Sequence, residues 1–216
     1  MKKIILTLFL ICTLVFSTKV YAKDVIPQYV SKVKTNTVGL YQASNQIVLH
    51  EQPDEKSNIV QKIEFQGETI YPEEITAEEL FVVFQPNKNL ALMAVLDEID
   101  GWVEVIYENS TGKSAWLKQD DPYKFSTWIY FYNTFGRKYG LKLLRTAPDE
   151  AKNLHAGTQD LSQITGTINM AEKINLTAIK GNWALVSVYD LDKIPKTGYV
   201  KWRSDDGIKY FFPDLK

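Results

Sequence analysis

The triplet Gly112-Lys113-Ser114 has the residue types that end a phosphate-binding loop. Such a loop also needs a glycine five residues before Gly112, so that successive backbone N–H groups can surround the anion. That position is Tyr107, and the triplet leads into residues 115–118, which are short and aromatic rather than the start of a helix. The stretch therefore predicts the tip of a β-hairpin and not a nucleotide site.

Histidine and serine chemistry has little support in the sequence. His50 and His155 are the only histidines, 105 residues apart, and we place them at non-equivalent points of the chain, on the surface. A Gly-x-Ser-x-Gly nucleophile elbow and a His-Glu-x-x-His zinc helix are both absent. A Ser–His–Asp group assembled from distant segments stays open, because triads are defined by geometry.

Carboxylate pairs are numerous but lie in charge-rich, turn-like segments. General acid catalysis needs one carboxyl group in a dry site that raises its pKa, whereas water around these pairs keeps the carboxyls ionised. We therefore predict a protein that is not an enzyme, with no catalytic residue, no metal and no cofactor. The pairs occur at residues 73–74, 78–79, 97–100, 120–121 and 205–206.

The first 22 residues have the pattern of a signal peptide. Lys2 and Lys3 precede a largely apolar run of 13 residues, and Val20-Tyr21-Ala22 places small residues at the cleavage positions. A run of 13 is shorter than the ~20 residues that span a bilayer, and the neighbours of Cys12 lack a lipoprotein box. We therefore predict a periplasmic or secreted protein without stable membrane insertion after signal cleavage.

Beyond residue 22 the chain contains no cysteine, which excludes disulfides, thiol catalysis and cysteine metal sites. The first 22 residues hold three of the 25 basic residues, so 22 remain against 26 acidic ones, a net charge of −4. That balance is ordinary for solubility and supplies no basic surface for nucleic acid.

Short β-branched or aromatic runs, separated by turn residues, dominate the rest of the chain. This pattern predicts an all-β protein of small barrels or a sandwich, with helix limited to a turn or two at 73–80 and 149–155. Strands are expected at 46–51, 80–84, 90–96, 102–107, 128–132, 141–144, 174–179, 183–189 and 198–202.

Two stretches repeat one pattern. Residues 101–118 and 182–201 both run from Trp through an alternating strand to Tyr, a polar loop, Lys, a small residue, an aromatic, an aliphatic and Lys. Upstream, residues 48–55 parallel 143–150 through a shared Pro-Asp-Glu. We therefore predict two related units with a boundary near 133–139. The predicted division is 1–22 for the signal, 23–134 for the first unit and 135–216 for the second.

The order of these features resembles bacterial SH3-like (SH3b) domains, over residues 38–118 and more weakly 139–203. The features are a strand leading to the turn at Pro53, a Gly-Trp-x-x-Val strand from Gly101 and a Gly-Lys-x-x-Trp-Leu-Lys hairpin from Gly112. The resemblance implies two small β-barrels in tandem, in an exported protein. The chain lacks the Arg-x-Gly-Pro pattern of the early strand, and its stretch 65–97 is longer than a minimal barrel needs.

Aromatic residues are the remaining candidate binding groups. The valines of the strand 102–107 favour the face shared with Tyr107 as core and leave Trp102 at a rim or under a loop. Large rings can simply fill two small cores, and a few can line a groove for sugar or extended peptide. The groove candidates are Tyr107, Trp116, Trp128, Tyr189, Tyr199 and Trp202.

The predicted function is that of an exported, non-catalytic binding module. Its ligand would be a peptidoglycan fragment (cell-wall peptide or glycan) or a partner envelope protein, and not nucleic acid. This prediction rests on resemblance, because fold alone does not establish function. The alternatives are a structural or assembly protein of the envelope that pairs through strand edges, and a small hydrolase of unfamiliar type.

Overall fold

The computed structural model describes residues 23–31, 36–120, 124–169, 172–189 and 194–216. The predicted signal peptide lies outside these residues. Strands account for 49% of the structure and helices for 13%, well below the roughly one-third helix of an average globular protein. The prediction of an all-β protein is therefore confirmed.

The first sheet is antiparallel and holds nine strands within the described ranges. Its pairing order is β4-β3-β2-β8-β7-β6-β1-β9, with β5 paired to β6 beside this path. The hairpin of β7 and β8 contains the Gly-Lys-Ser triplet. The strands are β1 (Gly39–Gln42), β2 (Gln46–His50), β3 (Ile59–Gln66), β4 (Thr69–Tyr71), β5 (Val83–Gln85), β6 (Leu90–Ile99), β7 (Trp102–Glu108), β8 (Lys113–Lys118) and β9 (Phe125–Thr127).

The second sheet is also antiparallel, with seven strands in the part of the chain that the structure describes. Its pairing order is β12-β11-β15-β14-β13-β10-β16. No strand pair among the described residues closes either sheet into a barrel. The strands are β10 (Leu141–Leu143), β11 (Asn153–His155), β12 (Ile164–Thr167), β13 (Lys173–Lys180), β14 (Trp183–Tyr189), β15 (Lys196–Lys201) and β16 (Phe211–Pro213).

The two sheets have the same strand order. Seven strands of the first sheet correspond one to one, in pairing order and in chain order, to the seven strands of the second. The corresponding paths are β3-β2-β8-β7-β6-β1-β9 and β12-β11-β15-β14-β13-β10-β16. The first sheet has two additional strands, β4 and β5. Both lie in the stretch 65–97, which is longer than a minimal SH3-like barrel needs. Because β10 takes the place of β1 rather than β2, the predicted Pro-Asp-Glu parallel between 48–55 and 143–150 is wrong.

A helical segment, residues 128–139, connects the sheets where the sequence suggests a strand at 128–132. It consists of α2 (Trp128–Phe131), a π-helical turn (Tyr132–Gly136) and α3 (Arg137–Tyr139). The Thr127 hydroxyl caps it by accepting a hydrogen bond from Tyr130 N at 3.3 Å. Aromatic residues such as these favour strands. The segment is helical nevertheless, because a helix buries Trp128, Phe131 and Tyr132 on one face.

The remaining helical turns are short. The turn α1 (Ala77–Leu80) falls within the predicted 73–80 and starts at Thr76, whose side chain accepts from Glu79 N. The predicted strand at 80–84 begins only at Val83, because Leu80 closes α1. The 3₁₀ turns are Pro86–Lys88 and Asp149–Lys152, and the second leads directly into β11.

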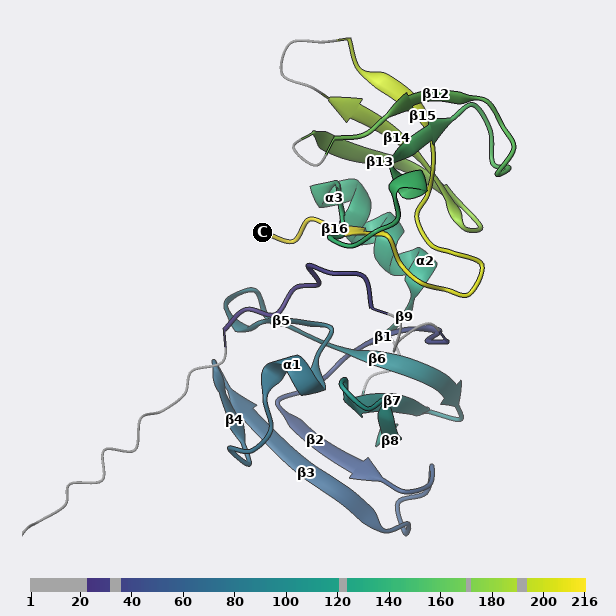
Figure 1. The fold of residues 1–216 in the computed structure, drawn as a ribbon. Coiled ribbons are helices and arrows are strands. Elements are labelled where there is room, and N and C mark those ends of the chain that lie inside the picture. Colours follow the sequence, from purple (N-terminus) through teal and green to yellow (C-terminus); the bar gives the residue numbers. More distant parts are fainter. Residues whose placement is uncertain (1–22, 32–35, 121–123, 170–171, 190–193) are drawn as a thin grey trace, which may run out of the picture.

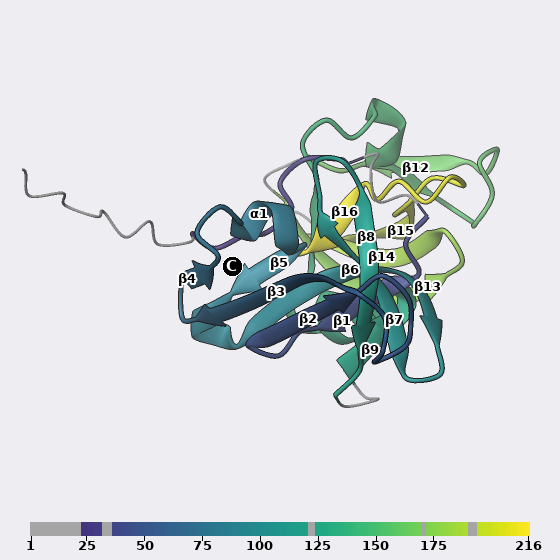
Figure 2. The same ribbon diagram turned by 90° about the horizontal axis from the view of Figure 1, so that it is seen from below.

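Figure 1 shows the two sheets toward opposite ends of the molecule, with the helical segment between them and β16, the edge strand of the second sheet, near the middle. Seen from below in Figure 2, the first sheet lies in front of the second. One apolar cluster fills the first unit and includes Val103 and Val105. The other fills the second unit and extends across the helical segment to Leu40 and Leu92 on the first sheet. The sheets are therefore joined through apolar packing.

Candidate functional site

Gly112 lies in the turn between β7 and β8, with a φ of 79° that suits glycine. Its N–H donates to Glu108 O at 2.8 Å. At the same tip, the Asn109 amide donates to the carbonyls of Glu78 and Phe81, which ties the hairpin to α1. The hairpin prediction is confirmed, and Lys113 is occupied by an ion pair with Glu108 at 2.6 Å.

The two histidines occupy equivalent places, so the prediction that they are non-equivalent is wrong. His50 ends β2 and His155 ends β11, and a register shift lies just before each of them. Each ring meets a tryptophan edge-on: His50 lies 5.2 Å from Trp102, and His155 lies 5.1 Å from Trp183. Both histidines are buried, at 9% and 8% exposed, rather than on the surface as predicted.

The loops that follow the histidines, 51–58 and 156–163, have the same length and are closed in the same way. Backbone bonds join Glu51 N to Asn58 O and Ala156 N to Gln163 O, both at 2.9 Å. Ser57 and Ser162 occupy the same loop position. Corresponding residues of the two units are therefore 105 positions apart from the end of β2 through this loop. The sequence signal for this correspondence is the shared Leu-His, Ser and Ile at the same spacing in 49–59 and 154–164.

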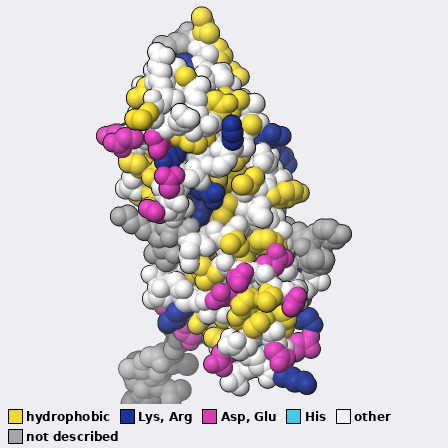
Figure 3. All heavy atoms as spheres, turned by 90° about the vertical axis from the view of Figure 1, so that its right-hand side faces the viewer, with side chains coloured by type: hydrophobic (Ala, Val, Ile, Leu, Met, Phe, Trp, Pro, Cys, Tyr) yellow, Lys and Arg dark blue, Asp and Glu magenta, His cyan; other side chains and the backbone are white. Residues whose placement is uncertain are grey.

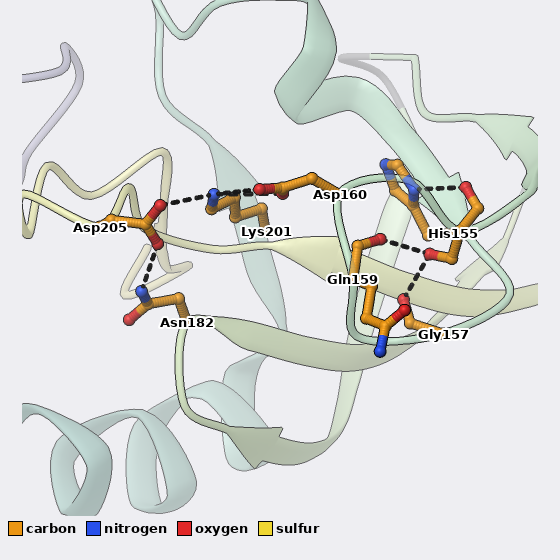
Figure 4. A network of polar contacts seen from close by, with 8 residues as sticks. His155, Gly157, Gln159, Asp160, Asn182, Lys201 and Asp205 are labelled. Carbon is orange, nitrogen blue, oxygen red and sulfur yellow. Dashed lines mark hydrogen bonds and ion pairs between the residues drawn. The ribbon is translucent and has the colours of Figure 1, made fainter.

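An ion pair fixes each loop to the neighbouring hairpin. Lys118, the last residue of β8, pairs with Glu55, and Lys201, the last residue of β15, pairs with Asp160 at 3.1 Å. Lys201 also contacts Asp205 at 3.3 Å (Figure 4). Hydrogen bonds from Asn182 and Lys201 lower the pKa of Asp205 below its ordinary value. Lysine and acid thus hold each loop beside the buried histidine.

One partly exposed ring stands at the centre of each repeated surface. Trp116 of β8 pairs with His50 on one side and Glu104 on the other. Tyr199 of β15 pairs with His155 and Leu185 in the same way. We call these surfaces the outer faces: the side of β2-β8-β7 and of β11-β15-β14 that faces away from the core. Paired residues on neighbouring strands share a face, so each ring has a fixed set of neighbours.

Trp128 and Trp202 are core residues, which corrects their prediction as groove residues. They are 3% and 0% exposed. The Trp202 Nε1 donates to Gly181 O at 3.0 Å, and its ring lies 4.3 Å from Tyr132. Burial raises the pKa of Tyr132 well above its ordinary value, and its hydroxyl donates to Phe211 O at 2.5 Å. These rings pack the helical segment into the core, and Trp128 also borders a small pocket beside the N-terminal segment.

Tyr107 and Tyr189 lie near the far ends of the corresponding strands β7 and β14. Tyr107 packs partly against the first core, next to a register shift. Tyr189 is 41% exposed and is the last described residue before 194. The six predicted rings therefore do not form one groove: Trp116 and Tyr199 occupy matching outer faces, Tyr107 and Tyr189 lie at strand ends, and two are buried.

Neither histidine contacts a serine hydroxyl within the described part of the chain. His155 Nδ1 lies 3.2 Å from the backbone oxygen of Ser162. The Ser162 hydroxyl is directed instead at the Gly157 and Gln159 carbonyls, at 3.0 and 2.5 Å (Figure 4). His50 Nδ1 is buried and has no hydrogen-bond partner among the residues that the structure describes. This geometry orders the loops and does not build a nucleophile–base pair.

On the side of the molecule shown in Figure 3, small groups of basic and of acidic side chains lie among apolar ones, and neither sign covers the whole side. In the described ranges no cluster of three or more histidine, cysteine or acidic residues is placed to hold a metal ion. Nor does any described helix combine the length and apolarity needed to cross a membrane.

Comparison with protein-family models and with curated proteins finds no match to this chain.

Proposed function

We propose that this chain is an exported, non-catalytic binding protein built from two SH3-like units, whose outer faces contact cell-wall peptide or glycan. The observation that carries this proposal is the repeated placement of one partly exposed ring, Trp116 or Tyr199, at the centre of each outer face. Aromatic rings bind sugars and extended peptides at low entropic cost, because they have few rotatable bonds.

The surroundings of these rings support binding better than catalysis. On each outer face the histidine is buried against tryptophan, and the lysine is held by an acid from the adjacent loop. The same arrangement recurs in both units, as expected of two surfaces that contact one kind of ligand. The repetition adds avidity, because binding of one face raises the effective concentration of ligand at the other.

A sedimentation assay tests the proposal. The described chain from Lys23 should sediment with purified peptidoglycan, and Trp116→Ala and Tyr199→Ala should each weaken binding by roughly 1–3 kcal/mol, taking aromatic–base stacking as a guide. Tyr130→Ala is the matched control, because this ring is 64% exposed but lies on α2. Its binding should equal that of the wild type.

Two results would overturn this proposal. If the wild type does not sediment with peptidoglycan, wall binding fails, and a partner envelope protein becomes the favoured ligand. If both ring variants sediment like the wild type while Tyr130→Ala does not, the outer faces are the wrong surface. Unchanged melting temperatures of the ring variants establish that lost binding is not lost folding.

Export is part of the proposal and has its own measurement. Protein recovered from the periplasm or medium should begin at Lys23 on N-terminal sequencing. An intact Met1 terminus in the membrane fraction would contradict it.

The alternative of an assembly protein is favoured by one observation. The edge strand β12 carries Ile164, which is 55% exposed, and the edge strand β4 carries Tyr71, which is 47% exposed. Uncovered edges with apolar side chains can pair with another chain. Sedimentation velocity decides: concentration-dependent oligomers that Ile164→Lys abolishes would support assembly, and a monomer at all concentrations would reject self-assembly.

A further inference from the structure

The exposed ring of each outer face belongs to a row of side chains that crosses five strands. Each residue of the row is paired with the next one across neighbouring strands, and paired residues share a face of the sheet. In the first unit the row consists of Ile59 (β3), His50 (β2), Trp116 (β8), Glu104 (β7) and Asp97 (β6). We call it the first row.

The second unit repeats this row strand for strand. The second row consists of Ile164 (β12), His155 (β11), Tyr199 (β15), Leu185 (β14) and Ala178 (β13). Both rows begin alike, with an isoleucine that is 49% or 55% exposed, a buried histidine and a partly exposed ring. A register shift also lies just before the last residue of each row. The two rows therefore share one geometry.

The rows differ in chemistry on one side of the ring. Glu104 and Asp97 occupy the two places that Leu185 and Ala178 occupy in the second row. All four side chains are exposed or half-buried, so a ligand on either face can reach them. The first row thus ends in two carboxylates, and the second ends in two aliphatic groups.

Neither carboxylate of the first row forms an ion pair with a lysine or arginine of the described chain. The donors that they meet are uncharged. Ser114 Oγ donates to Glu104 at 2.6 Å, and the backbone N–H of Glu98 donates to Asp97 at 2.8 Å. Two negative charges beside Trp116 are therefore left without a counter-charge from the described residues.

The lysines closest to this ring along the sheet do not reverse the sign of the surface. Lys118, two residues beyond Trp116 on β8, is paired with Glu55. Lys62 lies on β3, which is two strands away from β8 and three from the strand of Glu104. Because charge interactions weaken with distance, a positive group against the ring gains more from the two carboxylates than it loses to these lysines.

We propose that the first row binds a primary ammonium group of an extended wall peptide, against the Trp116 ring and beside Glu104, and that the second row contacts an uncharged part of the same ligand. The face of a tryptophan attracts a cation, and a carboxylate adds a charge-assisted hydrogen bond. Tyr199 has aliphatic neighbours in its row and no such preference. This inference rests on the proposed function, and it favours peptide over glycan at the first face, because an N-acetylated sugar has no ammonium group.

Sedimentation with purified peptidoglycan, before and after acetylation of its free amines, tests the proposal. The wild type should bind the acetylated wall at least about 5-fold more weakly. The double variant Glu104→Gln, Asp97→Asn should bind both forms alike, at the weaker level. Glu98→Gln is the matched control, because Glu98 is the next residue of β6 and pairs with the buried Val103 on the opposite face. It should keep the wild-type difference.

Soluble probes identify the source of the amine. The indole N–H signal of Trp116 in the NMR spectrum should shift on titration with Ac-Ala-Lys-Ala-NH2, which has a side-chain amine, or with Ala-Ala-NH2, which has a free N-terminus. The fully acetylated form of the same peptide should cause no shift. A shift with either amine supports the proposal and distinguishes a lysine-type side chain from a peptide N-terminus.

The outcomes separate this inference from the proposed function. Wall binding that acetylation does not weaken, or weakens equally in the wild type and the double variant, would overturn the inference and leave wall binding in place. If the wild type binds neither form of the wall, the proposed function fails, and the peptide titration decides the inference alone. Absence of a Trp116 shift with both amines would then refute it.

Discussion

Trp116 and Trp202 show how two indoles near the ends of corresponding hairpins acquire different roles. Trp202 follows β15, where the chain turns into the core, and its ring is enclosed by Tyr132 and the Gly181 carbonyl. Trp116 lies within β8 and alternates with the buried Ala115 and Leu117, so its ring faces outward. The first ring is part of the core, and the second is partly exposed to solvent.

We expect Trp202→Ala to lower the free energy of unfolding by ~3–5 kcal/mol, because it removes a fully buried ring and leaves a cavity. Trp116→Ala should cost clearly less, since its ring already contacts water in the folded state. Urea denaturation followed by far-UV circular dichroism measures both. Equal losses for the two variants would contradict the outward placement of Trp116.

The pH dependence of stability provides a test of Lys142. Its pKa is lower in the folded chain than the ordinary lysine value of 10.5, chiefly because of burial. Between these two pKa values the unfolded chain binds more protons, so the contribution of Lys142 to stability rises with pH there. Below the folded pKa its buried charge destabilises the fold by a constant amount.

Replacing this lysine by Met should therefore stabilise the protein at neutral pH, with a gain that shrinks as pH approaches 10.5. Urea unfolding at pH 7 and pH 10 measures the change, and Lys180→Met serves as the exposed control. A gain of the same size at both pH values would show that packing, and not charge burial, is responsible.

Residue chemistry was predictable where it depended on local pattern. Tyr107 in place of a glycine was enough to reject the phosphate loop. The histidines were misplaced because the Pro-Asp-Glu parallel aligned β2 with β10, whereas strand pairing aligns β2 with β11. Alternation assigned the valine face of β7 correctly, and Val103 and Val105 are fully buried. Alternation could not show that the other face of β7 is also partly buried. On that face Ile106 packs into the apolar cluster shared by the two units.

At the scale of elements, the helical segment 128–139 is the clearest departure from local propensity. Its buried aromatics lie at positions 128, 131 and 132, and the partly buried Phe135 follows at helical spacing, although each ring alone favours a strand. The segment ends at Gly140, whose φ is 84°. A Cβ there would come within 2.7 Å of Ile174 O, on β13 of the second sheet.

Gly140→Ala should therefore be strongly destabilising. The conformation of Gly140, with ψ near −176°, is essentially restricted to glycine, and such strain costs on the order of 1–3 kcal/mol before any clash is counted. Gly181→Ala is the matched comparison, since Gly181 also has positive φ, 58°, but a Cβ at that position would meet no described atom within 4 Å. Thermal denaturation should rank Gly140→Ala as the less stable variant, and the reverse order would refute the close approach to β13.

Several strands had no adequate signal in the sequence. The strands β9, β12 and β16 have three or four residues each, and β3 is mostly exposed, so none carries a hydrophobic alternation long enough to distinguish it from a loop. Pairing with neighbours decides their conformation. Longer runs such as β6, β7, β13 and β14 were anticipated within a few residues.

At the scale of the whole molecule, seven strands recur in one order, and packing joins the two copies. The shared apolar cluster reaches from Leu40 and Leu92 on the first sheet through Phe131 to Phe212 on the second. The N-terminal segment adds a bridge from Val25 to Phe84 in the first unit and from Tyr29 to Arg145 in the second. Neither sheet is therefore independent of the other in its packing.

This continuity predicts a single cooperative unfolding transition for the chain from Lys23. Separating the units would expose one side of the shared cluster to water, and burial of apolar surface is the main stabilising term. The calorimetric and van 't Hoff enthalpies of unfolding should agree, as expected of a two-state transition. Hydrogen exchange should report the same opening free energy for the slowest amides of β7 and of β14.

Phe131 provides the decisive variant, because its ring is 1% exposed and packs against Trp128 and Phe212 where the units meet. Phe131→Ala should cost ~3–5 kcal/mol and should lower the protection of β7 and β14 together if the core is shared. Tyr130→Ala, which removes the adjacent exposed ring, should leave the protection of β7 and of β14 unchanged. If Phe131→Ala lowers protection in one sheet alone, the two units fold separately and the interface between them is dispensable.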